Sequence, residues 1–232
     1  WNINFLGLRA HTILPYDGRL KLLPNYLSQL EMESNGKSVT NAGERVDFDT
    51  SPVIWGDVGA NAQHAFFQLL HQGTPAYYAD FIVPLRRKAS REYTQATRNQ
   101  LEYQQALNLA NCVAQSRVLM LGDEVLTWEQ SLAASPDRLY PGNHASSTLM
   151  FDELTPESLG QLIALYEHKV FVQAVVWDIN PFDQWGVELG KQIAKTTLSA
   201  IQNRRAGLGS PEDTKFDAST EGLLNHVFRH HT

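Results

Sequence analysis

Apolar positions along the chain follow two periodicities, and each predicts a different kind of element. Short apolar runs closed by turn residues predict strands over 11–18, 51–56, 79–84 and 147–151. Apolar residues at helical spacing predict helices over 20–30, 65–71, 92–121 and 155–179, with a last one over 219–228. Strands that alternate with helices indicate an α/β domain with a mainly parallel sheet.

One segment fits both periodicities. Residues 170–177 have strand propensity, but the apolar stripe that begins at Leu159 continues through Ala174 without a breaker. We therefore expect one long helix, opened by Thr155 as N-cap with Pro156 at the first position.

A second helix is expected from residue 180, because Asn180 suits an N-cap and Pro181 the first helical position. One face of it then carries an amide, a carboxylate and an ammonium, from Gln184, Glu188 and Lys191. The helix also contains Gly186 and Gly190, each of which costs about 1 kcal/mol relative to Ala. This indicates a close neighbour, although the spacing alone fits a solvated face equally well.

Composition narrows the class of protein. The 232 residues are 43% hydrophobic and 19% charged, which is typical of a soluble globular domain, and the net charge of −6 argues against nonspecific nucleic-acid binding. Cys112 is the only cysteine, so an intrachain disulfide is excluded, and we expect an inert core thiol in a cytoplasmic protein. No apolar run reaches the roughly 20 residues of a membrane helix. The chain begins at Trp1 without methionine, so we treat it as a fragment.

Two segments carry candidate chemistry. Glu31 and Glu33 lie at the end of the first helix, just before the Asn35-Gly36 turn, where the helix dipole disfavours a carboxylate. Residues 51–71 read as a strand, a small-residue loop that contains His64, and a helix, an order that places ligand groups at the carboxyl edge of a parallel sheet. Neither a phosphate fingerprint nor a zinc pattern is present.

Four ordered segments of the chain resemble the phosphoglucose isomerase family. They are residues 182–191 (FDQWGVELGK), 32–37 (MESNGK), 63–66 with 71–74 (QHAF and HQGT), and 166–169 with 177–180 (YEHK and WDIN). The resemblance implies a flavodoxin-like, three-layer sugar-isomerase domain over residues 1–200 with a C-terminal helical tail over 201–232. It also implies that a first sugar-isomerase domain, with the phosphate-binding loops and an arginine, lies N-terminal to this chain.

The resemblance further implies interconversion of glucose 6-phosphate and fructose 6-phosphate by ring opening and a cis-enediol intermediate. Glu33 matches the carboxylate that moves the proton, and Gln29 a glutamine that contacts the substrate. His64 matches the ring-opening histidine, supplied to the neighbouring subunit, so a homodimer is expected. Lys191 matches a lysine that assists ring opening and Gln184 a substrate-binding glutamine, while no metal or cofactor is implied. The loop before His64 departs from the common family pattern, as does the segment around His144.

Alone, this polypeptide is expected to be inactive, because the implied phosphate loops and arginine are missing and the charge of the intermediate would be uncompensated. The alternative is a noncatalytic, sugar-phosphate-binding regulatory domain of the same fold. That alternative predicts a Ser/Thr-rich phosphate loop, for which residues 146–148 are the nearest candidate. A third alternative is a secreted signalling form, which no secretion signal in the sequence supports.

Overall fold

The computed structural model describes residues 1–90, 92–125, 135–208 and 216–229. The chain falls into two compact units, Trp1–Phe182 and Asp183–Thr232, which are described one at a time. Among the residues that the structure describes, none of the helices combines the length and the hydropathy that a membrane span requires.

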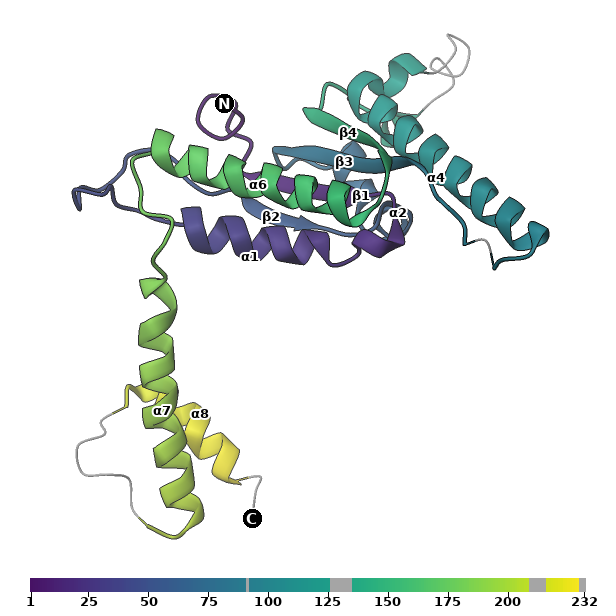
Figure 1. Ribbon diagram of the computed structural model, residues 1–232. Helices are drawn as coiled ribbons and strands as arrows, with labels where there is room; N and C mark the ends of the chain where they lie inside the picture. Colours follow the sequence, from purple (N-terminus) through teal and green to yellow (C-terminus); the bar gives the residue numbers. More distant parts are fainter. Residues whose placement is uncertain (91, 126–134, 209–215, 230–232) are drawn as a thin grey trace. The chain divides into compact units, whose positions relative to one another are not determined.

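The first unit is built on a four-stranded, all-parallel sheet (Figure 1). Its strands are β1 (Ala10–Pro15), β2 (Val53–Gly56), β3 (Tyr77–Arg86) and β4 (Ser146–Glu153), arranged in the order β2-β1-β3-β4. All four predicted strands are therefore confirmed, and so is the parallel α/β fold class.

Helices cover both faces of this sheet. Successive strand residues point to opposite faces, so neighbouring residues of one strand pack against different helices. Ile13 and Ile82 pack with α1 (Leu23–Asn35) and α6 (Pro156–Val176) on one face. Leu14 and Phe81, their neighbours in sequence, are buried in the core of the other face. The helices there are α2 (Gly59–Ala65), α3 (Phe67–Gln72) and α4 (Gln95–Leu121). Short 3₁₀ turns complete the unit: η1 (Gly18–Leu20), η2 (Gly122–Val125) and η3 (Pro136–Arg138).

Several local predictions are confirmed at the level of side chains. α6 is one continuous helix, and the Thr155 hydroxyl accepts from the Ser158 backbone in a capping box. Cys112 is fully buried, and desolvation raises the pKa of its thiol to about 12. It is the inert core thiol that the sequence predicts.

Two boundaries differ from the sequence prediction. The expected small-residue loop after β2 contains the short helix α2, which ends where Phe66 leaves the helical region at φ −146°. The helix expected from Asn180 starts only at Trp185. The Asn180 side chain accepts a hydrogen bond from the Phe182 backbone nitrogen at 3.0 Å, so it closes a turn at residues 180–182 in place of capping a helix.

The second unit consists of α7 (Trp185–Arg205) and α8 (Ala218–Arg229). Arg204 joins them, because its guanidinium donates to Glu221 at 2.5 Å and to Asn225 at 3.0 Å. Within this unit the space around Gly186 and Gly190 is open, so the close neighbour expected at these glycines stays a prediction. Gly209 and Pro211, expected in the loop after α7, lie outside the described residues.

Candidate functional site

The last turn of α1 presents the two candidate residues of the first helix, Gln29 and Glu33. They are four residues apart and therefore share one helix face, with Gln29 exposed and Glu33 half-buried. The helix ends at Gly36, whose backbone nitrogen donates to the Met32 carbonyl at 3.0 Å. Lys37 then donates to the Glu33 and Ser34 carbonyls, both at 2.7 Å, which satisfies two acceptors that the helix end leaves open.

Two buried side chains of this turn hold it against α6. Lys169 Nζ lies 2.8 Å from Glu31 Oε2, and Asn35 Nδ2 donates to the Val170 carbonyl at 3.1 Å. Glu31 and Asn35 are one turn apart and almost completely buried, at 2% and 0% exposure. Glu33 lies between them in sequence, about 200° around the helix from Glu31 at 3.6 residues per turn, so its side chain is directed away from these anchors.

His64 lies in α2 and is exposed. α2 begins three residues after β2 ends and packs at the carboxyl end of the sheet, where Gly59 faces the Tyr16 ring. A helix that joins two parallel strands runs back against them, so α1 ends at the opposite, amino end of the sheet (Figure 1). α1 has 13 residues and spans roughly 20 Å, so Glu33 and His64 lie far apart within one chain.

The second unit carries the other two candidates. Gln184 is the N-cap residue of α7 and is exposed. Lys191 Nζ pairs with Glu188 Oε1 at 2.8 Å, with side chains 64% and 49% exposed. Two residues of the predicted stripe, Glu188 and Lys191, therefore form an ion pair, whereas Gln184 precedes the helix and does not share its face.

A buried polar network, which the sequence pattern does not reveal, lies between the sheet and α6. His11 Nε2 is 2.9 Å from Asp80 Oδ2, and Tyr166 donates to the same oxygen at 2.8 Å. Lys169 connects this group to Glu31, since its Nζ also lies 3.5 Å from His11 Nδ1. The only signal in the sequence is that His11 and Asp80 interrupt otherwise apolar strands.

The network fixes the charges of its members. Burial is the main cause that lowers the pKa of His11, against the opposing effect of Asp80, so this imidazole is neutral near pH 7. Burial alone would raise the pKa of Asp80, but the hydrogen bonds from His11 and Tyr166 and the nearby charge of Lys169 lower it below 3.8. Asp80 is therefore an ionised, hydrogen-bonded carboxylate in the core.

His71 differs from His64 because it is buried. Its Nε2 lies 2.7 Å from Gln115 Oε1, and desolvation lowers its pKa. Among the described residues, no three His, Cys, Asp or Glu side chains gather as a metal site would require.

Comparison with known proteins decides the family. The family model of phosphoglucose isomerase matches residues 1–224. The chain belongs to the phosphoglucose isomerase family. Over 230 residues it is 60% identical to glucose-6-phosphate isomerase 2 of Chromohalobacter salexigens and 54% identical to glucose-6-phosphate isomerase of Psychrobacter arcticus.

A solved structure agrees with this assignment. The glucose-6-phosphate isomerase of Chlamydia trachomatis superposes with a TM-score of 0.75 at 36% identity, over the whole of this chain and 40% of that one. The two relatives are matched over 99% and 98% of this chain but only 39% and 40% of their own lengths. The chain thus spans about two fifths of these members of the phosphoglucose isomerase family.

Proposed function

We propose that this chain carries one side of the active site of a glucose-6-phosphate isomerase. In this proposal Glu33 takes the proton from one of the C1 and C2 carbons of the open-chain sugar and returns it to the other. Gln29 contacts the same substrate from one turn earlier on α1, and Gln184 helps to hold its phosphorylated end. Lys191 assists ring opening at the ring oxygen, oriented by its ion pair with Glu188.

The arrangement of the last turn of α1 carries this proposal. A general base has to stay within hydrogen-bond reach of the carbon-bound proton, so its backbone has to be fixed. Glu31 and Asn35 hold the turn on both sides of Glu33, and neither anchor occupies the Glu33 carboxylate. This turn is built to present a carboxylate outward from a fixed backbone.

We further propose that His64 opens the sugar ring in the active site of a second copy of the chain. The separation of Glu33 and His64 at opposite ends of the sheet supports this role, because a single copy does not bring them to one substrate. The active form is then a homodimer in which each subunit gives Glu33 to one site and His64 to the other.

The remaining part of the site belongs, in this proposal, to the portion of the relatives that this chain does not match. That portion supplies the phosphate-binding loops and the arginine that stabilises the enediol charge, so the chain alone is inactive. The regulatory alternative is not supported, because Ser146, Ser147 and Thr148 lie within β4 and form no loop that leads into a helix. Glycolysis and gluconeogenesis in the cytoplasm are the setting that we assign to this reaction.

A chimera tests the proposal. Residues 1–232 replace the matching segment of the Chromohalobacter relative, and fructose 6-phosphate turnover is followed by coupling the product to NADPH formation. We expect activity in the chimera, none in the isolated chain, and a loss of at least about 10³-fold in kcat for Glu33→Gln, because the proton transfer loses its base. Glu44→Gln, which removes an exposed carboxylate, is the matched control and leaves kcat unchanged.

Two results contradict this account. One is turnover by the isolated chain that survives Glu33→Gln. The other is a chimera in which Glu33→Gln and Glu44→Gln are equally active.

A further inference from the structure

A cavity of about 650 Å³ opens at the carboxyl end of β3 and β4. Its walls come from the end of β3 and the residues that follow it, from Glu153 at the end of β4, and from residues 102–109 of α4. The volume lies within the range of small-molecule sites. It is separate from the proposed isomerase residues, since its lining includes none of Gln29, Glu33, His64, Gln184 and Lys191.

The cavity lies at the carboxyl edge of the sheet, beside the ends of β3 and β4. In the strand order β2-β1-β3-β4, the chain passes from β1 to β2 at one edge of the sheet and from β3 to β4 at the other edge. The direction in which strands are added therefore reverses between β1 and β3. Ligands of open α/β sheets bind at such a reversal. The cavity lies next to it, on the β4 side of β3, since none of its lining residues follows β1. Arg87 is close enough to Asp17 for its charge to act on that carboxylate, together with the directly bonded Arg19.

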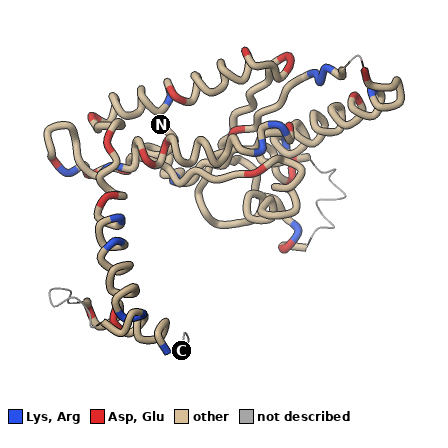
Figure 2. The backbone as a smooth tube through the Cα atoms, turned by 60° about the horizontal axis from the view of Figure 1, so that its bottom comes forward, with Lys and Arg blue, Asp and Glu red and all other residues tan. Residues whose placement is uncertain are grey.

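The cations around the cavity are not all engaged. Arg86, Arg87 and Lys88 form one basic run at the end of β3 (Figure 2). Arg86 is paired with Asp152, and Arg19 is held by Asp17 through contacts of 2.7–3.2 Å. In the part of the chain that the structure describes, the side chains of Arg87 and Lys88 make no ion pair or hydrogen bond.

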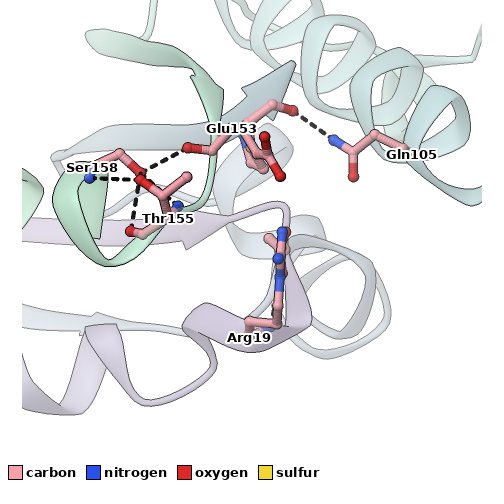
Figure 3. A network of polar contacts seen from close by, with 7 residues as sticks. Arg19, Gln105, Glu153, Thr155 and Ser158 are labelled. Atoms are coloured by element: carbon pink, nitrogen blue, oxygen red, sulfur yellow. Dashed lines mark hydrogen bonds and ion pairs between the residues drawn. The ribbon is translucent and has the colours of Figure 1, made fainter. Parts of the chain in front are cut away.

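Carboxylates and a fixed amide form the rest of the polar wall. Gln105 of α4 donates to the Pro84 carbonyl at 2.5 Å and fixes α4 against the end of β3 (Figure 3). Glu153 lies beside it, with its backbone carbonyl held by Ser158 at 2.7 Å. Together with Glu102, it adds two carboxylates to a lining that also contains Arg87 and Lys88. Such a wall repels polyanions and accepts hydrogen bonds from hydroxyl groups.

We propose that this cavity binds a small phosphate monoester of a polyol, with the phosphate on Arg87 and Lys88 and the hydroxyl groups toward Glu102 and Glu153. A monoester suits the wall because its phosphate needs two cations and its carbon chain brings donors for the carboxylates. Leu85, Ala106 and Leu109 supply apolar contact for the carbons. The site goes beyond the proposed isomerase function and does not depend on it.

The test uses residues 1–232 and glycerol 3-phosphate, with glycerol and inorganic phosphate as partial probes. Amide NMR titration is expected to show saturable shifts at residues 85–88 and 102–109, with glycerol 3-phosphate binding more tightly than either partial probe. Arg87→Gln/Lys88→Gln is expected to weaken binding by at least about tenfold, since a charge-assisted hydrogen bond contributes roughly that factor. Arg117→Gln/Lys195→Gln removes the same charge from exposed positions elsewhere and leaves binding unchanged.

A second variant keeps the charges and fills the space. Ala106→Phe, at an exposed position of the cavity wall, is expected to abolish binding while Arg87 and Lys88 remain. Shifts outside these residues, equal affinity in Arg87→Gln/Lys88→Gln and its control, or unchanged binding by Ala106→Phe would overturn the proposal. Co-sedimentation with phosphatidylglycerol vesicles in place of binding to the free ester would also overturn it.

Discussion

The ion pair between Glu31 and Lys169 offers a sharp test of how the last turn of α1 is held. The Nζ to Oε2 distance is 2.8 Å, and the side chains are 3% exposed for Glu31 and 29% for Lys169. Removing one partner of a buried pair costs about 3–5 kcal/mol, because the other charge is left unpaired away from water. Since the two partners are unequally buried, the cost depends on which one is removed.

Lys169→Met leaves the buried carboxylate of Glu31 without its cation, and we expect a loss of about 3 kcal/mol in the free energy of unfolding. Glu31→Gln leaves Lys169, which reaches water, so the expected loss is only about 1 kcal/mol. The double variant is expected to lose about 2 kcal/mol, well below the additive value, because neither substituted side chain carries a charge and none is left buried without a partner.

Urea unfolding followed by circular dichroism measures these losses. With an m-value of about 2–3 kcal/mol/M, Lys169→Met lowers the midpoint by about 1 M or more. Lys191→Met is the matched control, because the Lys191–Glu188 pair has the same 2.8 Å separation but side chains 64% and 49% exposed. Its expected effect stays within about 0.5 kcal/mol. Equal losses for Lys169→Met and Glu31→Gln, or additive losses in the double variant, would refute this reasoning.

Three further predictions concern the first unit. The pKa of His11 is lowered in the fold, so just below pH 6.5 only the unfolded chain binds a proton on this side chain. The free energy of unfolding is therefore expected to fall as pH drops from about 7.5 to about 5.5, and to fall less steeply in His11→Gln. The same unfolding titration checks this, and Asp80, with its lowered pKa, adds a loss in the same direction only below about pH 4. Gly56→Ala places a Cβ 2.0 Å from the Ile13 carbonyl oxygen at φ +152°, so we expect the thermal unfolding temperature to be several degrees lower. Gly160→Ala is the control, because its Cβ meets open space within α6, and it leaves the unfolding temperature unchanged or higher. Cys112 is expected to react with a disulfide reagent only in denaturant, since its thiol is buried and its pKa is raised to about 12; fast reaction in native buffer would contradict that.

Much of the first unit follows from local patterns in the sequence. The strands were predictable because buried parallel strands are apolar and end in turn residues, as residues 51–56 do. The single helix α6 was predictable because its apolar stripe continues without interruption. Glu33 could be placed at a helix end from the Asn35-Gly36 turn alone.

The differences arise where a polar side chain has more than one available partner. Asn180 could cap a helix or its own turn, and the sequence does not say which bond forms. His11, Asp80 and Lys169 come from three distant segments, and no local period indicates that they meet. The distance between Glu33 and His64 likewise emerges only when α1 is seen to run back across the sheet.

Mixing two inactive variants tests the central claim most directly. In the chimera, Glu33→Gln and His64→Gln each disable every site, but a mixed dimer contains one site with both native residues if His64 acts in the partner subunit. Random exchange makes half of the dimers mixed, so we predict recovery of about a quarter of the unmutated activity. Complete lack of recovery, with subunit exchange verified by differently tagged chains, would contradict the account.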